Sequence, residues 1–169
     1  PNLTTLEIVG NRIGAAGVAA LARANWSKLT HLRVSDNAIG SQGAFALAKA
    51  SGKWPNLASL LVAKNGIGNE GVATLAAGKW PRLTTLSVRD NEIEGLDGAC
   101  ALAAGDWPQL LSLDVARNRL GSKGLQVVLG ISPSLTELDI TEPGIYKKKA
   151  VWAAFENANW RACHDARYA

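Results

Sequence analysis

The sequence predicts an α/β solenoid, a right-handed horseshoe arc with parallel strands on its concave face and helices on its convex face. Two observations predict this fold. A leucine-based pattern returns every 25 to 28 residues, and each return is followed by glycines and a stretch rich in Ala and Leu. A fixed period of this length is typical of repeat arrays, in which neighbouring units complete one another's core.

The first half of each unit predicts a short strand. A leucine is followed by apolar residues three and five positions later, as in Leu29, Leu32 and Val34. The six units begin at Leu3, Leu29, Leu57, Leu83, Leu110 and Leu135. We expect these positions to face inward and the strands to be parallel, because the outer half of each unit crosses back over the outside.

Five units carry an asparagine at their ninth position, followed two residues later by Ile or Leu. These asparagines are Asn11, Asn37, Asn65, Asn91 and Asn118. A buried Asn can hydrogen-bond backbone groups that a curving chain would leave unpaired. The sequence therefore predicts a ladder of stacked asparagines inside the array.

The outer half of each unit predicts a helix, because Ala and Leu are strong helix formers. We expect helices near residues 15–24, 41–50, 69–77, 96–104 and 122–130. Glu94 adds one residue before the glycine of the fourth unit, so the loop there should bulge. Neighbouring strands are about 4.8 Å apart whereas packed helices need roughly 8–10 Å, and this difference curves the array.

Four tryptophans occupy one place in the repeat, three residues before the next leucine. They are Trp26, Trp54, Trp80 and Trp107. A place that is fixed by the repeat predicts core or edge packing, and it disfavours a ladder of aromatic rings for stacking a ligand.

Residues 1–169 are interpreted as one domain of about six repeats plus a degraded C-terminal repeat over 146–169. Pro1-Asn2-Leu3 matches Pro55-Asn56-Leu57, which Trp54 precedes. We therefore expect the chain to be a piece of a longer protein that begins inside the pattern. A further helix over 147–160 and a weak strand after it predict a terminal cap, with a cut before more repeats as the alternative.

Composition narrows the class of protein. The chain is 47% hydrophobic with a net charge of +4, and no run approaches the roughly 18 apolar residues of a membrane helix. We expect a folded monomer without a membrane span, and the mild charge disfavours a nucleic-acid partner. Cys100 and Cys163 lack metal-ligand spacing, which predicts free thiols in a reducing compartment and no metal or other cofactor.

Residues that point outward from the predicted strands, and those at the strand ends, form a candidate surface for a protein partner. The candidates are Glu7, His31, Arg33, Leu61, Lys64, Ser87, Arg89, Asp114, Arg117, Glu137 and Asp139. We expect a basic track of Arg33, Lys64, Arg89 and Arg117, and an acidic C-terminal end of Asp114, Glu137, Asp139 and Glu142. Leu61 would serve as a small apolar anchor. The alternative is that these charges only solvate the surface.

The other basic residues are expected on helices and outer loops, where they favour solubility. They are Arg23, Lys28, Lys49, Lys53, Lys79, Arg82 and Lys123. The run Lys147-Lys148-Lys149 is read as a solvated helix start, with a localisation or nucleic-acid patch as the alternative.

The sequence does not predict an enzyme. It contains no nucleophile elbow, phosphate-binding loop or zinc-protease motif, and His31 and His164 have no metal spacing. Ser59 and His31 are expected on adjacent strands but lack an acidic partner for a catalytic triad. GTPase activation through Arg12 or Arg119 is a further alternative, because both follow ladder asparagines and could project from the rims.

The repeat is similar to the ribonuclease-inhibitor-like leucine-rich repeats, and nearest to the GALA subtype of plant-pathogen type III effectors. The residues that carry this resemblance are the helix starts Gly43-Ala44-Phe45-Ala46-Leu47-Ala48 and Gly98-Ala99-Cys100-Ala101-Leu102-Ala103. It covers about residues 1–145 and implies a leucine-rich-repeat solenoid. It also implies that the array selects protein substrates, as in F-box effectors that act with host ubiquitin ligases.

We therefore expect a protein-recognition module. One form of it is the substrate-selecting array of a bacterial effector that acts in the host cytoplasm or nucleus. The alternative is a structural role, in which the array acts as a spacer or as a lid on a neighbouring domain.

Overall fold

The computed structural model describes residues 2–132 and 134–141, and within them short strands alternate with helices. The strands are β1 (Thr5–Glu7), β2 (His31–Arg33), β3 (Ser59–Leu61), β4 (Thr85–Ser87), β5 (Ser112–Asp114) and β6 (Glu137–Asp139). The helices are α1 (Gly14–Leu21), α2 (Gly40–Ala50), α3 (Gly68–Ala76), α4 (Gly95–Ala103) and α5 (Gly121–Leu129), with a 3-10 helix η1 (Ser51–Lys53) after α2.

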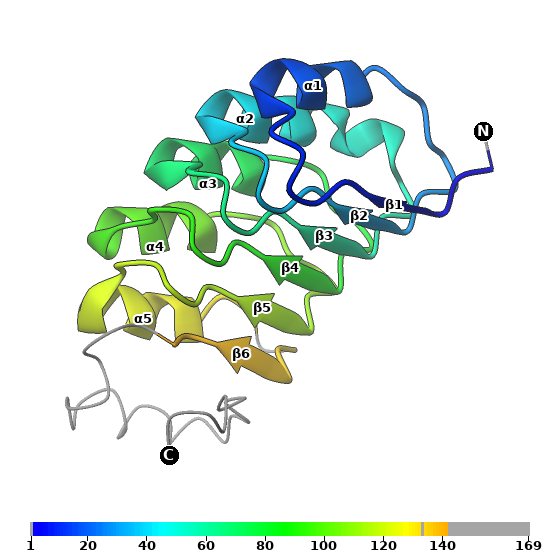
Figure 1. Cartoon of the computed structure of the whole chain (residues 1–169). Helices are drawn as coiled ribbons and strands as arrows, with labels where there is room; N and C mark the ends of the chain where they lie inside the picture. Colours follow the sequence, from blue (N-terminus) through cyan, green and yellow to red (C-terminus); the bar gives the residue numbers. More distant parts are fainter. Residues whose placement is uncertain (1, 133, 142–169) are drawn as a thin grey trace.

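The strands form one parallel sheet in the order β1-β2-β3-β4-β5-β6. The central leucines of successive strands are register partners, as Leu32, Leu60 and Leu86 illustrate. Figure 1 shows the strands on one side of a curved stack and the helices on the other. This arrangement confirms the predicted α/β solenoid.

The helices begin and end close to where the sequence predicts. Each starts one residue earlier than expected, and α1 ends at Leu21, before the predicted residue 24. Each also starts at a glycine with positive φ. Gly68, for example, has φ +61° and an added Cβ would meet nothing within 4 Å, so backbone conformation alone requires glycine there.

The second glycine of the Gly-x-x-Gly pair on α3, α4 and α5 lets the neighbouring helix approach closely. A Cβ on Gly124 would lie 2.9 Å from the carbonyl oxygen of Gly95 and 3.2 Å from Cβ of Ala99. A Cβ on Gly71 would lie 3.2 Å from Cβ of Ala44 on α2. Small residues therefore set the spacing of the convex layer.

The leucine lattice and three of the tryptophans form the core. Leu32, Leu60 and Leu86 are each 1% exposed. Trp54, Trp80 and Trp107 are buried too, and the indole N–H of each donates to a backbone carbonyl. Trp26 is partly buried and its ring stacks on Trp54 with centroids 5.8 Å apart. The predicted structural role of the tryptophans is confirmed.

The asparagine ladder is present as predicted. It runs from Asn37 to Asn118, whereas Asn11 in the first unit is exposed. Within the ladder the side-chain oxygen of each buried Asn accepts the backbone N–H of the preceding Asn, so Asn65 Oδ1 bonds Asn37 N at 2.9 Å and Asn91 Oδ1 bonds Asn65 N at 2.9 Å. The side-chain NH2 of Asn65 also donates to the carbonyls of Val34 and Val62. Each buried Asn thus joins two units through their backbones.

The extra residue at Glu94 changes the local backbone, as the sequence predicts. Glu94 is extended, with φ −126° and ψ 141°, whereas the residues before the other helices have helical angles. The Asn69 side chain holds both backbone groups of Glu94, accepting its N–H at 2.8 Å and donating to its carbonyl at 3.1 Å. The bulge is therefore fixed by neighbouring units.

Candidate functional site

The fifth position of every unit forms one continuous row across the concave sheet. The row consists of Glu7, Arg33, Leu61, Ser87, Asp114 and Asp139, which are register partners on successive strands. These side chains alternate with the buried leucines and therefore point away from the core. The row passes through two halves with different environments.

The half of the row on β1, β2 and β3 is open to solvent. Glu7 and Arg33 are exposed, and Leu61 is half-buried. Within residues 2–132 and 134–141, the side chains of Glu7 and Arg33 take part in no hydrogen bond or ion pair. An unpaired carboxylate, an unpaired guanidinium and an apolar side chain thus stand side by side on this surface.

His31 lies on the same strand as Arg33 and is exposed. Its ring Nδ1 is 2.8 Å from the hydroxyl oxygen of Thr30, the preceding residue. His31 and Ser59 are register partners on β2 and β3, as the sequence predicts. In the described structure the His31 ring contacts Thr30 and not the Ser59 hydroxyl, so the pair does not form the hydrogen bond that activates a nucleophile.

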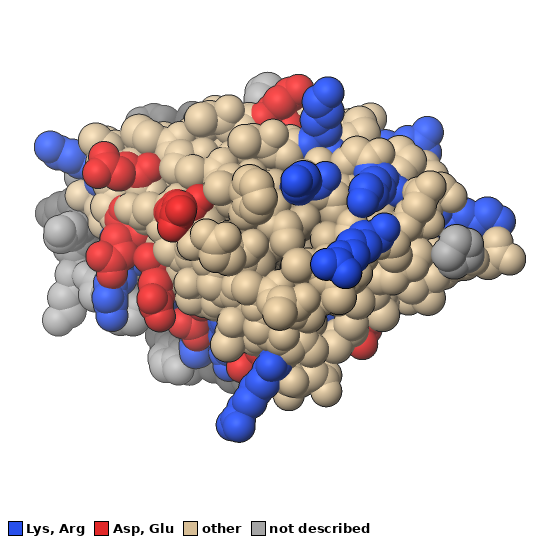
Figure 2. All heavy atoms as spheres, turned by 90° about the horizontal axis from the view of Figure 1, so that it is seen from above, with Lys and Arg blue, Asp and Glu red and all other residues tan. Residues whose placement is uncertain are grey.

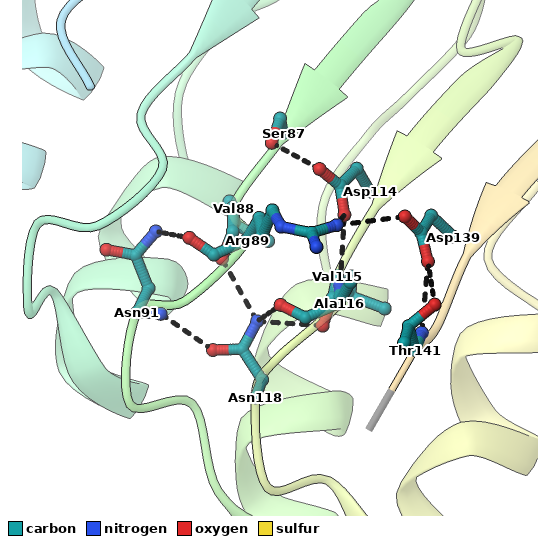
Figure 3. A network of polar contacts seen from close by, with 10 residues as sticks. All are labelled: Ser87, Val88, Arg89, Asn91, Asp114, Val115, Ala116, Asn118, Asp139 and Thr141. Atoms are coloured by element: carbon teal, nitrogen blue, oxygen red, sulfur yellow. Dashed lines mark hydrogen bonds and ion pairs between the residues drawn. The ribbon is translucent and has the colours of Figure 1, made fainter. Parts of the chain in front are cut away.

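The half of the row on β4, β5 and β6 is a polar network (Figure 3). The Ser87 hydroxyl donates to Asp114 Oδ2 at 2.8 Å, and the backbone N–H of Ala116 donates to Asp114 Oδ1 at 3.0 Å. Arg89 Nη1 lies 3.0 Å from Asp139 Oδ2 and 3.7 Å from Asp114 Oδ1. The guanidinium therefore lies between two carboxylates that neighbouring strands bring together.

Asp139 is held from its other side as well. Its Oδ1 accepts the backbone N–H of Thr141 at 3.0 Å and the Thr141 hydroxyl at 2.7 Å. The side chains of Arg89 and Asp139 each keep 27% of their surface exposed. We name Ser87, Arg89, Asp114, Asp139 and Thr141 the concave network.

Burial raises the pKa of Asp114 above its usual value of 3.8, and the nearby Asp139 carboxylate acts in the same direction. The hydrogen bonds from Ser87 and Ala116 and the positive charge of Arg89 oppose this by favouring the carboxylate. Since the pKa is raised overall, loss of solvent at Asp114 outweighs the bonds that it accepts.

The predicted basic track is wrong at Arg89. Its charge is taken up by Asp114 and Asp139, which the sequence analysis assigned to a separate acidic end. Ser87 was expected to face a partner, but it is only 8% exposed because its hydroxyl is bonded to Asp114 on the next strand. Position in the repeat predicted where these side chains lie, but it did not predict which ones pair.

Lys64 and Arg117 lie at the strand ends, exposed as expected. Both have φ of 55°, in the left-handed region. The same conformation recurs at this eighth position in the other loops, at Gly10 (71°), Asp36 (58°) and Asp90 (55°). The signal for it in the sequence is Gly10, since glycine adopts this region without strain. Glu137 on β6 is exposed, and Glu142 lies outside the described residues.

Four large apolar side chains of the described residues are exposed and stand outside the candidate list: Val9, Phe45, Leu96 and Leu111. Val9 was expected at the rim of the concave face. Val9 and Leu111 are each 43% exposed. Their signal is an apolar residue at a position that other units fill mostly with small or polar residues. The second position, for example, is Thr4, Thr30, Ala58, Thr84, Leu111 and Thr136.

Comparison with known proteins identifies the repeat. The family model described as Leucine Rich repeat matches residues 1–22, 27–48, 55–76 and 108–129, more than half of the chain. The chain belongs to the leucine-rich-repeat family. Proteins of this family are typically binding modules without catalytic activity, and the repeats support a protein-interaction module here. A search of curated proteins found no match.

Two solved structures are among those similar to this chain. Leiomodin-1 Actin-Binding Site 2 is 14% identical with a TM-score of 0.53, and the match covers 94% of this chain and 79% of that one. An internalin from Listeria monocytogenes strain 4b F2365 is 20% identical with a TM-score of 0.47, covering 95% of this chain and 47% of that one.

The described part of the leucine-rich-repeat chain contains no group of three His, Cys, Asp or Glu residues arranged to hold a metal ion. No helix within it has the length and apolar character needed to cross a bilayer. Cys100 is an exposed free thiol on α4. Cys163, His164, the predicted helix over 147–160 and the degraded repeat over 146–169 lie outside the described residues.

The arginines considered for GTPase activation lie in different surroundings. Arg119 Nη1 forms an ion pair with Glu94 Oε1 at 2.8 Å, on the bulged loop of the fourth unit. Arg12 is exposed in the first unit, with φ of 50°. The strand register separates their units by four repeats, so the two do not converge on one site.

Proposed function

We propose that this leucine-rich-repeat chain recognises a protein partner through its concave face, with the main contact on the open half formed by β1, β2 and β3. The contact residues would be Glu7, His31, Arg33, Leu61 and the rim residue Lys64. Arg117, Glu137 and the concave network would border this contact and complement the partner's charge.

The observation that carries the proposal is the row of Glu7, Arg33 and Leu61 on adjacent strands. The two charged side chains have no polar partner within the described residues, and the apolar one is left half-exposed beside them. A docked partner can pair both charges and bury the leucine, which supplies specificity and apolar burial together.

The concave network supports the proposal in another way. Its side chains are already held by one another, so they lose little conformational freedom when a partner docks. It would therefore act as a rigid border, whereas the open half provides the adaptable charges.

The test is capture of partner proteins by immobilised chain, measured by quantitative mass spectrometry, with Arg33→Glu compared against wild type. Lys123→Glu is the matched control, because Lys123 is exposed on α5 and makes the same charge change on the convex side. We expect Arg33→Glu to reduce captured partners about tenfold and Lys123→Glu to leave them unchanged. Capture of the same proteins in the same amounts by all three chains would contradict the proposal.

A finer hypothesis is that the partner is a substrate selected by a bacterial effector. It is supported only by the helix starts such as Gly43-Ala44-Phe45-Ala46-Leu47-Ala48. The full-length sequence tests it, since an F-box-like segment is expected beside the array. If no protein is captured specifically by the wild-type chain, the structural role as a spacer or lid is favoured.

A further inference from the structure

The convex face has a groove between α1 and α2, on the side opposite the proposed concave contact. It encloses about 540 Å³ and is open to solvent. Ala15 and Ala19 of α1 and Ala46 of α2 contribute only methyl groups to it, and Phe45 stands at its wall. A volume of this size is within the range of roughly 300–1,000 Å³ that binding pockets occupy.

The groove exists because of the residues at one outward position of the helices. Phe45 lies five residues after Gly40, the first glycine of α2. The residues at the same distance from the first glycine of the other helices are Ala19, Ala73, Cys100 and Gln126. Phe45 is 52% exposed, and the α1 residue that faces the groove at this position is only an alanine. The aromatic ring is therefore left beside empty space that no neighbouring side chain fills.

The rim of the groove is basic. Arg23, Lys49 and Lys53 line it, and the lining contains no Asp or Glu. Lys53 Nζ donates to the carbonyl of Ala22 at 3.2 Å, which places its charge at the end of α1. From the sequence these three cations were expected to favour solubility, whereas in the structure they lie around one apolar groove.

The groove lies in a part of the chain where basic residues outnumber acidic ones. Between residues 8 and 69 the chain carries one acidic residue, Asp36, and seven basic ones: Arg12, Arg23, Lys28, Arg33, Lys49, Lys53 and Lys64. Figure 2 looks down on the α1 end of the array and shows Lys and Arg side chains gathered on one part of this face, with most Asp and Glu side chains on the opposite side. The potential at the groove is therefore positive and attracts acidic partners.

We propose that the groove between α1 and α2 binds an acidic segment of a protein, which inserts an apolar side chain against Phe45 and the alanines and places Asp or Glu beside Arg23, Lys49 and Lys53. Single-stranded nucleic acids stack successive bases on several aromatic rings along a basic groove. The lining of this groove holds one aromatic ring, Phe45, among alanines, so an acidic segment with one apolar side chain fits it better. This site is separate from the concave face.

The experiment uses two display libraries of short peptides with a randomised apolar centre, one flanked by Glu and one by Lys. Both are selected on the wild-type chain, and the recovered peptides are measured by fluorescence anisotropy. We expect the Glu-flanked library alone to yield binders. Their affinity should fall about tenfold with Lys49→Glu, which reverses a rim charge, and with Ala19→Leu, which fills the groove.

The controls separate this site from other surfaces. Lys79→Glu makes the same charge change at an exposed residue outside the groove lining, and Arg33→Glu alters the concave face; both should leave peptide binding unchanged. Lys49 is exposed, so its variant keeps the test valid even where Ala19→Leu disturbs folding.

Three results would overturn the proposal: no binders, equal recovery from both libraries, or binders that Lys49→Glu does not weaken. Displacement of the peptides by phosphatidylserine vesicles or single-stranded DNA would overturn it as well, since it would show a general anion surface.

Discussion

The two halves of the concave face share one scaffold and differ in what they do with their charges. On β1, β2 and β3 the fifth-position side chains are open, and Arg33 has no polar partner within the described residues. On β4, β5 and β6 the same position carries Ser87, Asp114 and Asp139. Ser87 donates to Asp114, and Arg89 pairs with both carboxylates. Side chains at the same position of the repeat are therefore exposed in one half and hydrogen-bonded or ion-paired in the other.

This difference arises from the order of side chains across strands. In a parallel sheet, equivalent positions of neighbouring units lie about 4.8 Å apart. Two carboxylates in succession, at Asp114 and Asp139, attract the nearest cation, Arg89 from the adjacent loop. In the open half, Leu61 separates Arg33 from Ser87, the next polar side chain toward β4. The other neighbour of Arg33 in the row is Glu7, and these two side chains form no ion pair within the described residues.

The largest expected change in stability comes from the asparagine ladder, and it tests whether the interior of the two halves is the same. Asn65→Ala and Asn118→Ala each remove a buried amide that accepts a backbone N–H and donates to carbonyls of two units. Each should lower the free energy of unfolding by about 2–3 kcal/mol, because buried backbone groups lose their partners. Chemical denaturation measures this, with exposed Asn25→Ala as the control that should change stability by less than about 0.5 kcal/mol.

If Asn65→Ala and Asn118→Ala differed greatly, the two halves would differ in their interior as well as on their surface. That outcome would contradict the assignment of the difference to the concave row alone.

A smaller effect is expected from pH in the networked half. Burial raises the pKa of Asp114 above 3.8 in the folded chain, so the unfolded chain loses this proton first as pH rises. Asp114 therefore contributes most to stability below pH 3.8, and this contribution declines as pH rises through the folded pKa. Asn cannot ionise, so Asp114→Asn removes this loss of stability with rising pH. The free energy of unfolding of the variant, relative to that of wild type, should therefore increase between a pH below 3.8 and neutral pH.

Denaturation curves across this pH range measure the change, and Asp106→Asn, at an exposed loop residue, controls for the loss of one charge. A stability difference between Asp114→Asn and wild type that stays constant with pH, or that moves in favour of wild type as pH rises, would show that burial does not dominate at Asp114.

The fold could be predicted from the sequence because the buried leucines and asparagines are recognised by their spacing alone. Leu60 and Asn65 recur at fixed positions, and their burial and bonds follow from the coil that the period imposes. The bulge at Glu94 was predictable for the same reason, as one extra residue in a fixed period. Helix starts were predicted within one residue, since glycine marks each of them.

The surface was harder to predict because pairing depends on contacts between units. Arg89 was correctly placed near the concave face, but its bond to Asp139 joins residues 50 positions apart. Ser87 is buried through the same network. The groove beside Phe45 also depends on two units, since a small Ala19 on α1 leaves space next to a large side chain on α2.

The most direct measurement is 15N relaxation of the arginine Nε–H groups by NMR in the free chain. We expect restricted motion for Arg89, because the carboxylates of Asp114 and Asp139 hold its guanidinium. We expect large-amplitude motion for Arg33 in the open half. Equal order for the two side chains, whether both are rigid or both are mobile, would contradict the division of the concave face into an open and a networked half.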